Sequence, residues 1–278
     1  MDITPIEEVI PEKQIVIFAP HYDDVLLGLG GYVLELKAVD RLFSKQFHVL
    51  QLFSRSNYQT GSGKGNYDTS LERIKFATGR RLIEDLDCLD ELFGEHAYRY
   101  ELLGERECML RAKFLADCEM EFPHGLYEDF SDEDRQIFNR LQNLVRTWAA
   151  YEDTALVFPL AIKEHIDHFI TREAGITIAK ELETSSKARF YFQEDKPYAG
   201  IQTPEEVERI RTFIESNTLA SRFYKTSPDK VVKLAFKHYI SQVDEVYQKG
   251  VLQRPEQLKE LYGLTDSCDC IYPLLATT

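Results

Sequence analysis

The sequence lacks a long hydrophobic run. No apolar stretch approaches the ~18 residues that a membrane-spanning helix requires, so we expect no membrane span. The first 14 residues are acidic, with no basic segment followed by an apolar one, so we also expect no signal peptide. These two absences predict a cytoplasmic protein.

Basic residues are also scarce. The chain of 278 residues has 33 lysines and arginines against 47 aspartates and glutamates, which gives a formal net charge of −14. Such a surface repels polyanions, and this argues against nucleic acid or an anionic membrane as the main partner. A small soluble substrate suits this charge better.

Cysteines are few and irregularly spaced. The five form neither an even disulfide framework nor two pairs with zinc-finger spacing: Cys88, Cys108, Cys118, Cys268 and Cys270. This pattern is typical of a protein from a reducing compartment. The sequence also lacks internal repeats and a clear linker, so we predict a single domain over residues 1–278.

Short apolar runs alternate with helical patterns along the chain. The runs predict buried strands at residues 15–19, 47–53, 155–159 and 189–193. Helical patterns are found at residues 25–42, 71–92, 131–148, 204–217, 229–248 and 255–261. A further helix is expected from the HIDH segment to about residue 182. Residues 54–70 and 101–130 are predicted to be loops. The alternation predicts an α/β fold, a Rossmann-like, mostly parallel sheet with helices on both faces in three α/β/α layers.

Polar side chains follow the first predicted strand. His21, Asp23 and Asp24 lie in a strand-to-helix turn that glycines follow. Imidazole nitrogens and carboxylate oxygens are ordinary zinc ligands, and a carboxylate beside a metal-bound water is a natural general base. A polar turn whose aspartates cap the next helix explains the same residues.

A second polar cluster follows the predicted strand at 155–159. It contains His165, Asp167 and His168. The carboxyl ends of parallel strands meet at one edge of a sheet, so we expect the two clusters to lie together. One histidine can then complete a His–Asp–His metal set, while the other stabilises charge on a substrate oxygen. Asp167 can orient a neighbouring imidazole through its ring N–H. The alternative is a polar loop with two surface histidines.

The two clusters resemble motifs of the PIG-L-like (LmbE-like) zinc-dependent N-acetylglucosaminyl deacetylases. The family's A/P-H-P-D-D motif, which precedes a glycine-rich helix start, is similar to PHYDDVLLGLGG at residues 20–31, and its H-x-D-H motif to HIDH at 165–168. Weaker similarities are found in RLIEDLDCLDEL, FQEDKPYAG and KLAFKHYISQ. The resemblance spans about residues 14–245 and leaves residues 246–278 as a C-terminal extension.

The resemblance implies a role for each residue of the two motifs. The zinc ligands would be His21, Asp24 and His168. Asp23 would be the general base, His165 would stabilise the oxyanion, and Asp167 would orient His165. A His/Asp/His set selects zinc only weakly, so Fe(II), Mn(II) and Ni(II) stay open.

Three further residues are predicted to contact substrate. Tyr22 replaces the proline of the first family motif and is expected at the mouth of the pocket. Lys163 precedes HIDH, where it can reach an anionic group; an exposed loop charge is the alternative. Arg55 follows the second strand, where it can bind a hydroxyl or a phosphate; a surface arginine is the alternative.

These observations predict a metal-dependent N-deacetylase. It would remove an acyl group, most simply acetyl, from an amino sugar or its conjugate. A metal-dependent amidase or esterase for another small metabolite is one alternative, and a metal-binding module without turnover is another. The complete polar set argues against the last, because a decayed enzyme would be expected to lose Asp23 or a ligand first. The sequence leaves the oligomeric state open, a homo-oligomer included.

Overall fold

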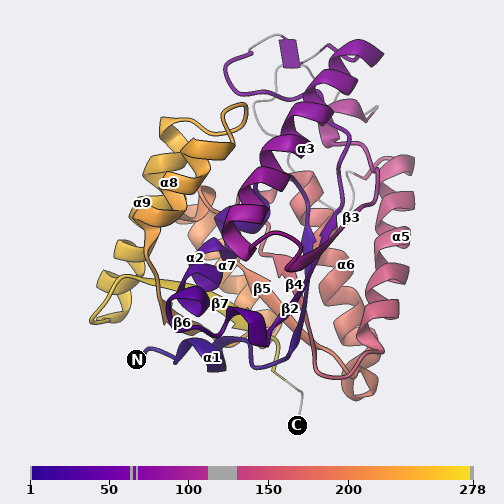
Figure 1. Cartoon of the computed structure of the whole chain (residues 1–278). Helices are drawn as coiled ribbons and strands as arrows, with labels where there is room; N and C mark the ends of the chain where they lie inside the picture. Colours follow the sequence, from indigo (N-terminus) through magenta and orange to yellow (C-terminus); the bar gives the residue numbers. More distant parts are fainter. Residues whose placement is uncertain (1, 63–64, 67, 112–129, 276–278) are drawn as a thin grey trace.

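A seven-stranded sheet forms the centre of the protein (Figure 1). The computed structural model describes residues 2–62, 65–66, 68–111 and 130–275. The strands are β1 (Gln14–Ala19), β2 (Gln46–Gln51), β3 (Tyr98–Leu102), β4 (Thr154–Pro159), β5 (Arg189–Gln193), β6 (Arg222–Lys225) and β7 (Cys268–Pro273). Their order is β3-β2-β1-β4-β5-β7-β6. The first five are parallel, and β7 runs antiparallel to both of its neighbours.

Helices cover both faces of this sheet. They are α1 (Ile6–Val9), α2 (Asp24–Ala38), α3 (Leu71–Phe93), α5 (Asp132–Ala149), α6 (Ile166–Leu182), α7 (Pro204–Ser216), α8 (Pro228–His238) and α9 (Glu245–Tyr262). One core lies under α5, α6 and α7, and the other under α1, α2, α3 and α8. In Figure 1, α5 and α6 stand on one side of the sheet, and α8 and α9 on the other. No helix among the described residues is long and apolar enough to cross a membrane.

The central strands are apolar throughout because both of their faces are buried. In β1, Val16 and Phe18 enter the core under α5 and α6, while Ile15 and Ile17 enter the core under α2. Side chains of a strand alternate between faces, so a two-sided core requires a continuous apolar run. The α/β class and the four strands predicted from such runs are confirmed.

Three strands escaped prediction, since none of them is a continuous apolar run. The edge strand β3 reads YRYEL and is half exposed, and β6 has only four residues. β7 reads CDCIYP and lies in the predicted C-terminal extension. Because β7 is inserted between β5 and β6, that extension completes the sheet. The interval 101–130 also holds the end of β3, and residues 112–129, with Cys118, lie outside the described residues.

The prediction of helices at 229–248 and 255–261 was wrong. Helix α8 ends at His238, and α9 runs unbroken from Glu245 to Tyr262 with Pro255 inside it. The side chain of Asp244 accepts from two backbone N–H groups at the start of α9, which places the helix start there.

Candidate metal centre and active site

The topology brings the two predicted polar clusters together. Strands β1 and β4 are parallel neighbours, so the turn after β1 and the loop after β4 leave the same edge of the sheet. Helix α2 begins at Asp24, and the side chain of Asp23 makes no capping hydrogen bond to it. The carboxylate of Asp24 instead accepts from the backbone N–H of His21 at 2.6 Å. Helix capping therefore does not explain the aspartate pair.

Three donor atoms form a small triangle at this edge. Nδ1 of His21 lies 3.1 Å from Nε2 of His168 and 3.7 Å from Oδ2 of Asp24, and the last two atoms are 3.4 Å apart. A tetrahedral zinc ion with ligand bonds of 2.0–2.2 Å holds its donors about 3.4 Å apart. The three predicted ligands are therefore spaced to hold such an ion.

Buried carboxylates orient both imidazole rings. Nε2 of His21 lies 3.0 Å from Oδ2 of Asp167, and Nδ1 of His168 contacts Oδ1 of Asp195. Each carboxylate accepts from a protonated ring nitrogen, and a ring that carries no second proton then presents a lone pair on its other nitrogen toward the triangle. Two lone pairs and a carboxylate facing one another repel unless a cation lies among them. This donor set fits a divalent metal ion.

The charges of the triangle are strongly coupled. Burial alone would lower the pKa of His168, but Asp24 and Asp195 raise it to about 9. Burial raises the pKa of Asp24 to about 6, against the attraction of the two histidines. Without a metal ion, a proton on His168 offsets the surrounding negative charge.

Asp23 is buried next to the triangle. Its side chain is 6% exposed. The pKa of the Tyr198 hydroxyl is raised first by the burial of Tyr198 and then by the negative charge of Asp23. Asp23 and Glu107 also surround the buried guanidinium of Arg81, which is 4% exposed. Besides burial, the charge of Asp23 also acts to raise the pKa of Asp24, so the two carboxylates lie near each other.

The neutral form of His165 is suited to donate a hydrogen bond. Burial and the neighbouring His21 lower its pKa well below 6.5. Nδ1 of His165 accepts from the backbone N–H of Asp167 at 3.3 Å, so the ring proton lies on Nε2, 3.7 Å from Sγ of Cys108. The rings of His165 and His21 are 4.8 Å apart.

The carboxylate of Asp167 contacts His21, whereas the resemblance implied a contact with His165. Its Oδ2 atom contacts Nε2 of His21 and accepts from the backbone N–H of Cys108, each at 3.0 Å. The hydrogen bond to His165 comes instead from the backbone N–H of Asp167. The carboxylate of Asp167 thus orients a predicted metal ligand, and its orientation of His165 stays a prediction.

The loop that precedes His165 has an unusual backbone. Ala161, Lys163 and Glu164 all have positive φ angles, of 55°, 64° and 55°. Non-glycine residues in this conformation cost about 1–3 kcal/mol each and are found where other contacts hold them in place. One such contact is the backbone N–H of Ile162, which donates to Oδ2 of Asp195 at 3.0 Å. Asp195 therefore holds both His168 and this loop.

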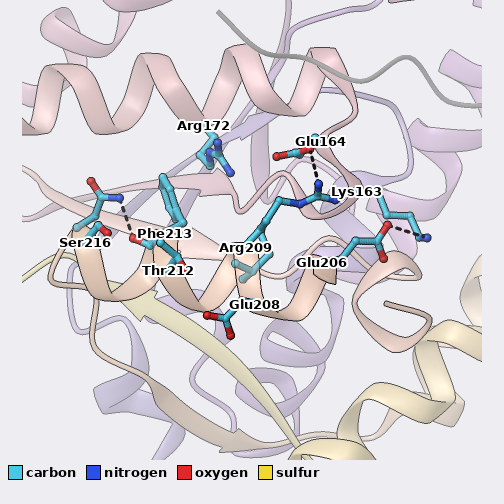
Figure 2. A pocket seen from close by; sticks show the side chains of 11 residues that line it. Lys163, Glu164, Arg172, Glu206, Glu208, Arg209, Thr212, Phe213 and Ser216 are labelled. Carbon is cyan, nitrogen blue, oxygen red and sulfur yellow. Dashed lines mark hydrogen bonds and ion pairs between the residues drawn. The ribbon is translucent and has the colours of Figure 1, made fainter. Parts of the chain in front are cut away.

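Lys163 points toward α7. Its ammonium group lies 3.3 Å from Oε1 of Glu206, and Arg209 of α7 reaches Glu164 (Figure 2). These side chains line a groove of about 410 Å³ between the loop, α6 and α7. Glu206 on α7 thus offsets the positive charge of Lys163, which was expected to contact an anionic group of the substrate.

The other two predicted substrate contacts differ in placement. Tyr22 is fully buried, its hydroxyl donates to the carbonyl of Ser54 at 2.6 Å, and its ring packs 5.5 Å from the guanidinium of Arg81. Because Tyr22 is fully buried, the structure does not support its expected position at the mouth of the pocket. Arg55 is exposed, and its backbone N–H donates to Glu105 at 3.0 Å. Its contact with substrate stays a prediction.

Sequence reasoning missed three residues of this site. Asp195 had a usable signal, because it is a carboxylate just beyond the end of β5. Cys108 and Arg111 had none, since they follow the unpredicted strand β3 in an irregular segment. Arg111 is fully buried and makes an ion pair of 2.6 Å with Asp167.

Comparison with solved structures finds this fold in known deacetylases. The chain is similar to the A40926 pseudoaglycone deacetylase, at 14% identity and a TM-score of 0.55 over 96% of this chain and 99% of that chain. It is similar to the zinc-inhibited form of the teicoplanin deacetylase, at 16% identity and a TM-score of 0.60 over 95% and 98%. The N,N'-diacetylchitobiose deacetylase of Pyrococcus horikoshii matches at 12% identity and a TM-score of 0.56 over 98% and 87%. Neither a scan against models of protein families nor a search of curated proteins finds a match. The structural likeness confirms the fold that the motifs implied.

Proposed function

We propose, from the premise that this chain has the fold of the LmbE-like deacetylases, that it is a metal-dependent N-deacetylase. One observation carries the proposal. His21, Asp24 and His168 present three donor atoms spaced 3.1–3.7 Å apart, the ring of His165 packs on His21, and the charge of Asp23 acts on Asp24. Ligands, base and oxyanion donor are then the parts that amide hydrolysis needs.

The metal site would be held by the two histidines and Asp24. When bound, a divalent ion such as Zn²⁺ polarises the amide carbonyl and acidifies water. Fe(II), Mn(II) and Ni(II) suit the same donors. Asp167 and Asp195 keep the ring protons away from the ion, as their contacts with His21 and His168 require.

Asp23 and His165 would do the proton and charge chemistry. Asp23 accepts a proton from the attacking water and returns it to the amine nitrogen as the C–N bond breaks. Nε2–H of His165 donates to the carbonyl oxygen as negative charge develops on it. A neutral His165 suits this role, because its Nδ1 can accept from the backbone N–H of Asp167 while its Nε2–H is left to donate.

The proposed substrate is a small N-acetylated amino sugar or its conjugate. The structures with this fold include deacetylases of teicoplanin, of an A40926 pseudoaglycone and of N,N'-diacetylchitobiose. We place the enzyme in the cytoplasm, since the four cysteines within the described residues are all unpaired. Arg55 is the proposed contact for parts of the substrate beyond the amide, and Lys163 is a second one for an anionic group that displaces Glu206.

The first test is metal content. We expect about one zinc per chain in the purified wild type and loss of that zinc in His168→Ala. A wild-type protein that binds none of Zn²⁺, Fe²⁺, Mn²⁺ or Ni²⁺ on addition would overturn the proposal.

The second test separates catalysis from binding. Asp23→Asn should keep its zinc and lose about 10²–10⁴-fold in turnover of N-acetylated amino sugars. Asp40→Asn, which lies beyond the far end of α2, is the matched control and should be fully active. Zinc binding without deacetylation of any amino sugar would direct the search to other amides and esters, and full activity of Asp23→Asn would remove the assigned base.

A further inference from the structure

We infer that Arg111 and Asp134 form a positioning pair for the metal centre, because together they hold Asp167 in the orientation that fixes the ring of His21. The inference rests on the proposed metal site. Neither residue touches the three donor atoms of the triangle. Both act through the carboxylate of Asp167.

The guanidinium of Arg111 has no freedom to turn. Its Nε donates to Oδ1 of Asp134 at 2.6 Å, its Nη1 donates to the backbone carbonyl of Arg106 at 2.7 Å, and its Nη2 lies 2.6 Å from Oδ1 of Asp167. The group also lies 5.1 Å from the ring centre of Phe53, and the side chain is fully buried. A planar guanidinium bound at all three nitrogens has one orientation.

Asp134 is held just as firmly on the other side. It is the third residue of α5 and the capping-box partner of Ser131, whose backbone N–H donates to Oδ2 of Asp134 at 2.9 Å. The remaining oxygen, Oδ1, binds Arg111. The start of α5 is thereby joined to the active site by a single buried arginine.

The consequence for the metal centre follows from the two oxygens of Asp167. Arg111 makes an ion pair with Oδ1, which restrains rotation of the carboxylate and keeps Oδ2 against Nε2 of His21. With its proton at Nε2, His21 must present Nδ1 toward Asp24 and His168. Loss of the arginine would free the carboxylate to turn and the ring to change its protonated nitrogen.

The test measures zinc affinity by competition with a chelator, with Arg106→Gln as the matched control. Arg111→Lys keeps the charge but cannot contact both carboxylates and the carbonyl at once, so its zinc Kd should rise about tenfold. Asp134→Asn should shift Kd in the same direction by less. Arg106 also pairs with α5, through Glu133 at 2.7 Å, but is exposed, so its variant should leave Kd unchanged.

A merely structural role gives a different pattern. It would lower the melting temperature of Arg111→Lys and leave the zinc Kd at the wild-type value, and that result would overturn the inference. In the double variant with Asp167→Asn, Kd should equal that of Asp167→Asn alone, because the arginine acts through that carboxylate; additive effects would contradict it. If Arg111→Lys does not fold, an unchanged Kd in Asp134→Asn is equally decisive. A wild-type chain without zinc affinity would instead refute the proposed function.

Discussion

Replacing Asp195 by asparagine tests whether one carboxylate holds both His168, a proposed metal ligand, and the loop that precedes His165. Oδ1 of Asp195 contacts Nδ1 of His168, and Oδ2 accepts from the backbone N–H of Ile162 at 3.0 Å. Asparagine has the same shape but turns one of these acceptors into a donor. One of the two N–H groups must then face another N–H group.

The magnitude follows from which contact is kept. If the amide oxygen stays on His168, the buried N–H of Ile162 loses its acceptor, which costs about 1–3 kcal/mol of folding free energy. If it stays on Ile162, the ring proton of His168 moves to Nε2, the atom that faces His21 and Asp24. Loss of such a partner typically weakens metal binding about 10–100-fold, or about 1.4–2.8 kcal/mol. We therefore expect either a lower melting temperature of the metal-free protein with the zinc Kd kept, or a weaker zinc site, according to the contact that the amide oxygen keeps.

The assay is zinc competition together with thermal unfolding of the metal-free chain. Glu194→Gln is the matched control, because Glu194 is the neighbouring buried carboxylate and binds Arg254 and Tyr272 instead. It should lower the melting temperature and leave the zinc Kd unchanged. A zinc Kd within about twofold of the wild type together with an unchanged melting temperature of the metal-free protein would refute the reasoning, because Asp195→Asn must weaken one of the two contacts.

Three more predictions concern pH and packing. Burial raises the pKa of Asp85 to about 8, so its contribution to stability is complete below about pH 4 and is lost as pH rises through 8. Asp85→Asn should therefore remove a slope of up to about 1.4 kcal/mol per pH unit from urea unfolding between those limits, and a persisting slope would contradict this cause. Burial lowers the pKa of His168, but two carboxylates raise it to about 9, so zinc must displace a proton from this ring. The affinity for zinc should therefore rise about tenfold per pH unit between about pH 7 and 9. A zinc Kd that stays constant over this range would argue against that proton. Gly175→Ala in α6 places a Cβ 2.8 Å from the ring of Phe158 and should lower the free energy of unfolding by about 1–3 kcal/mol. Gly79→Ala in α3, with nothing within 4 Å of the new Cβ, should raise it by up to about 1 kcal/mol. Equal shifts of the urea midpoint in the two variants would show that packing is irrelevant.

The two candidate clusters could be predicted to lie together because their signals are local. The apolar run of β1 and the turn from His21 to Asp24 are contiguous, and so are β4 and the HIDH segment. A parallel sheet brings the carboxyl ends of such strands to one edge whatever the details of packing. The sequence therefore determined the α/β class and the edge of the sheet at which the candidate donors meet.

The partners of those donors depended on the tertiary structure. Asp167 faces His21 rather than the adjacent His165, because Arg111 and the backbone of Cys108 hold its carboxylate there. No periodicity in the sequence marks Arg111, which joins the site from a segment after the edge strand β3.

Elements without a local signal were decided in the same way. β7 contains Asp269, and in the folded chain that carboxylate lies 2.8 Å from the ammonium group of Lys196. The backbone of Lys163 is left-handed although nothing in its side chain favours that. Apolar burial follows a short-range pattern that a sequence displays, whereas a buried charge takes whichever partner the fold places beside it, and that choice exists only once distant segments have packed.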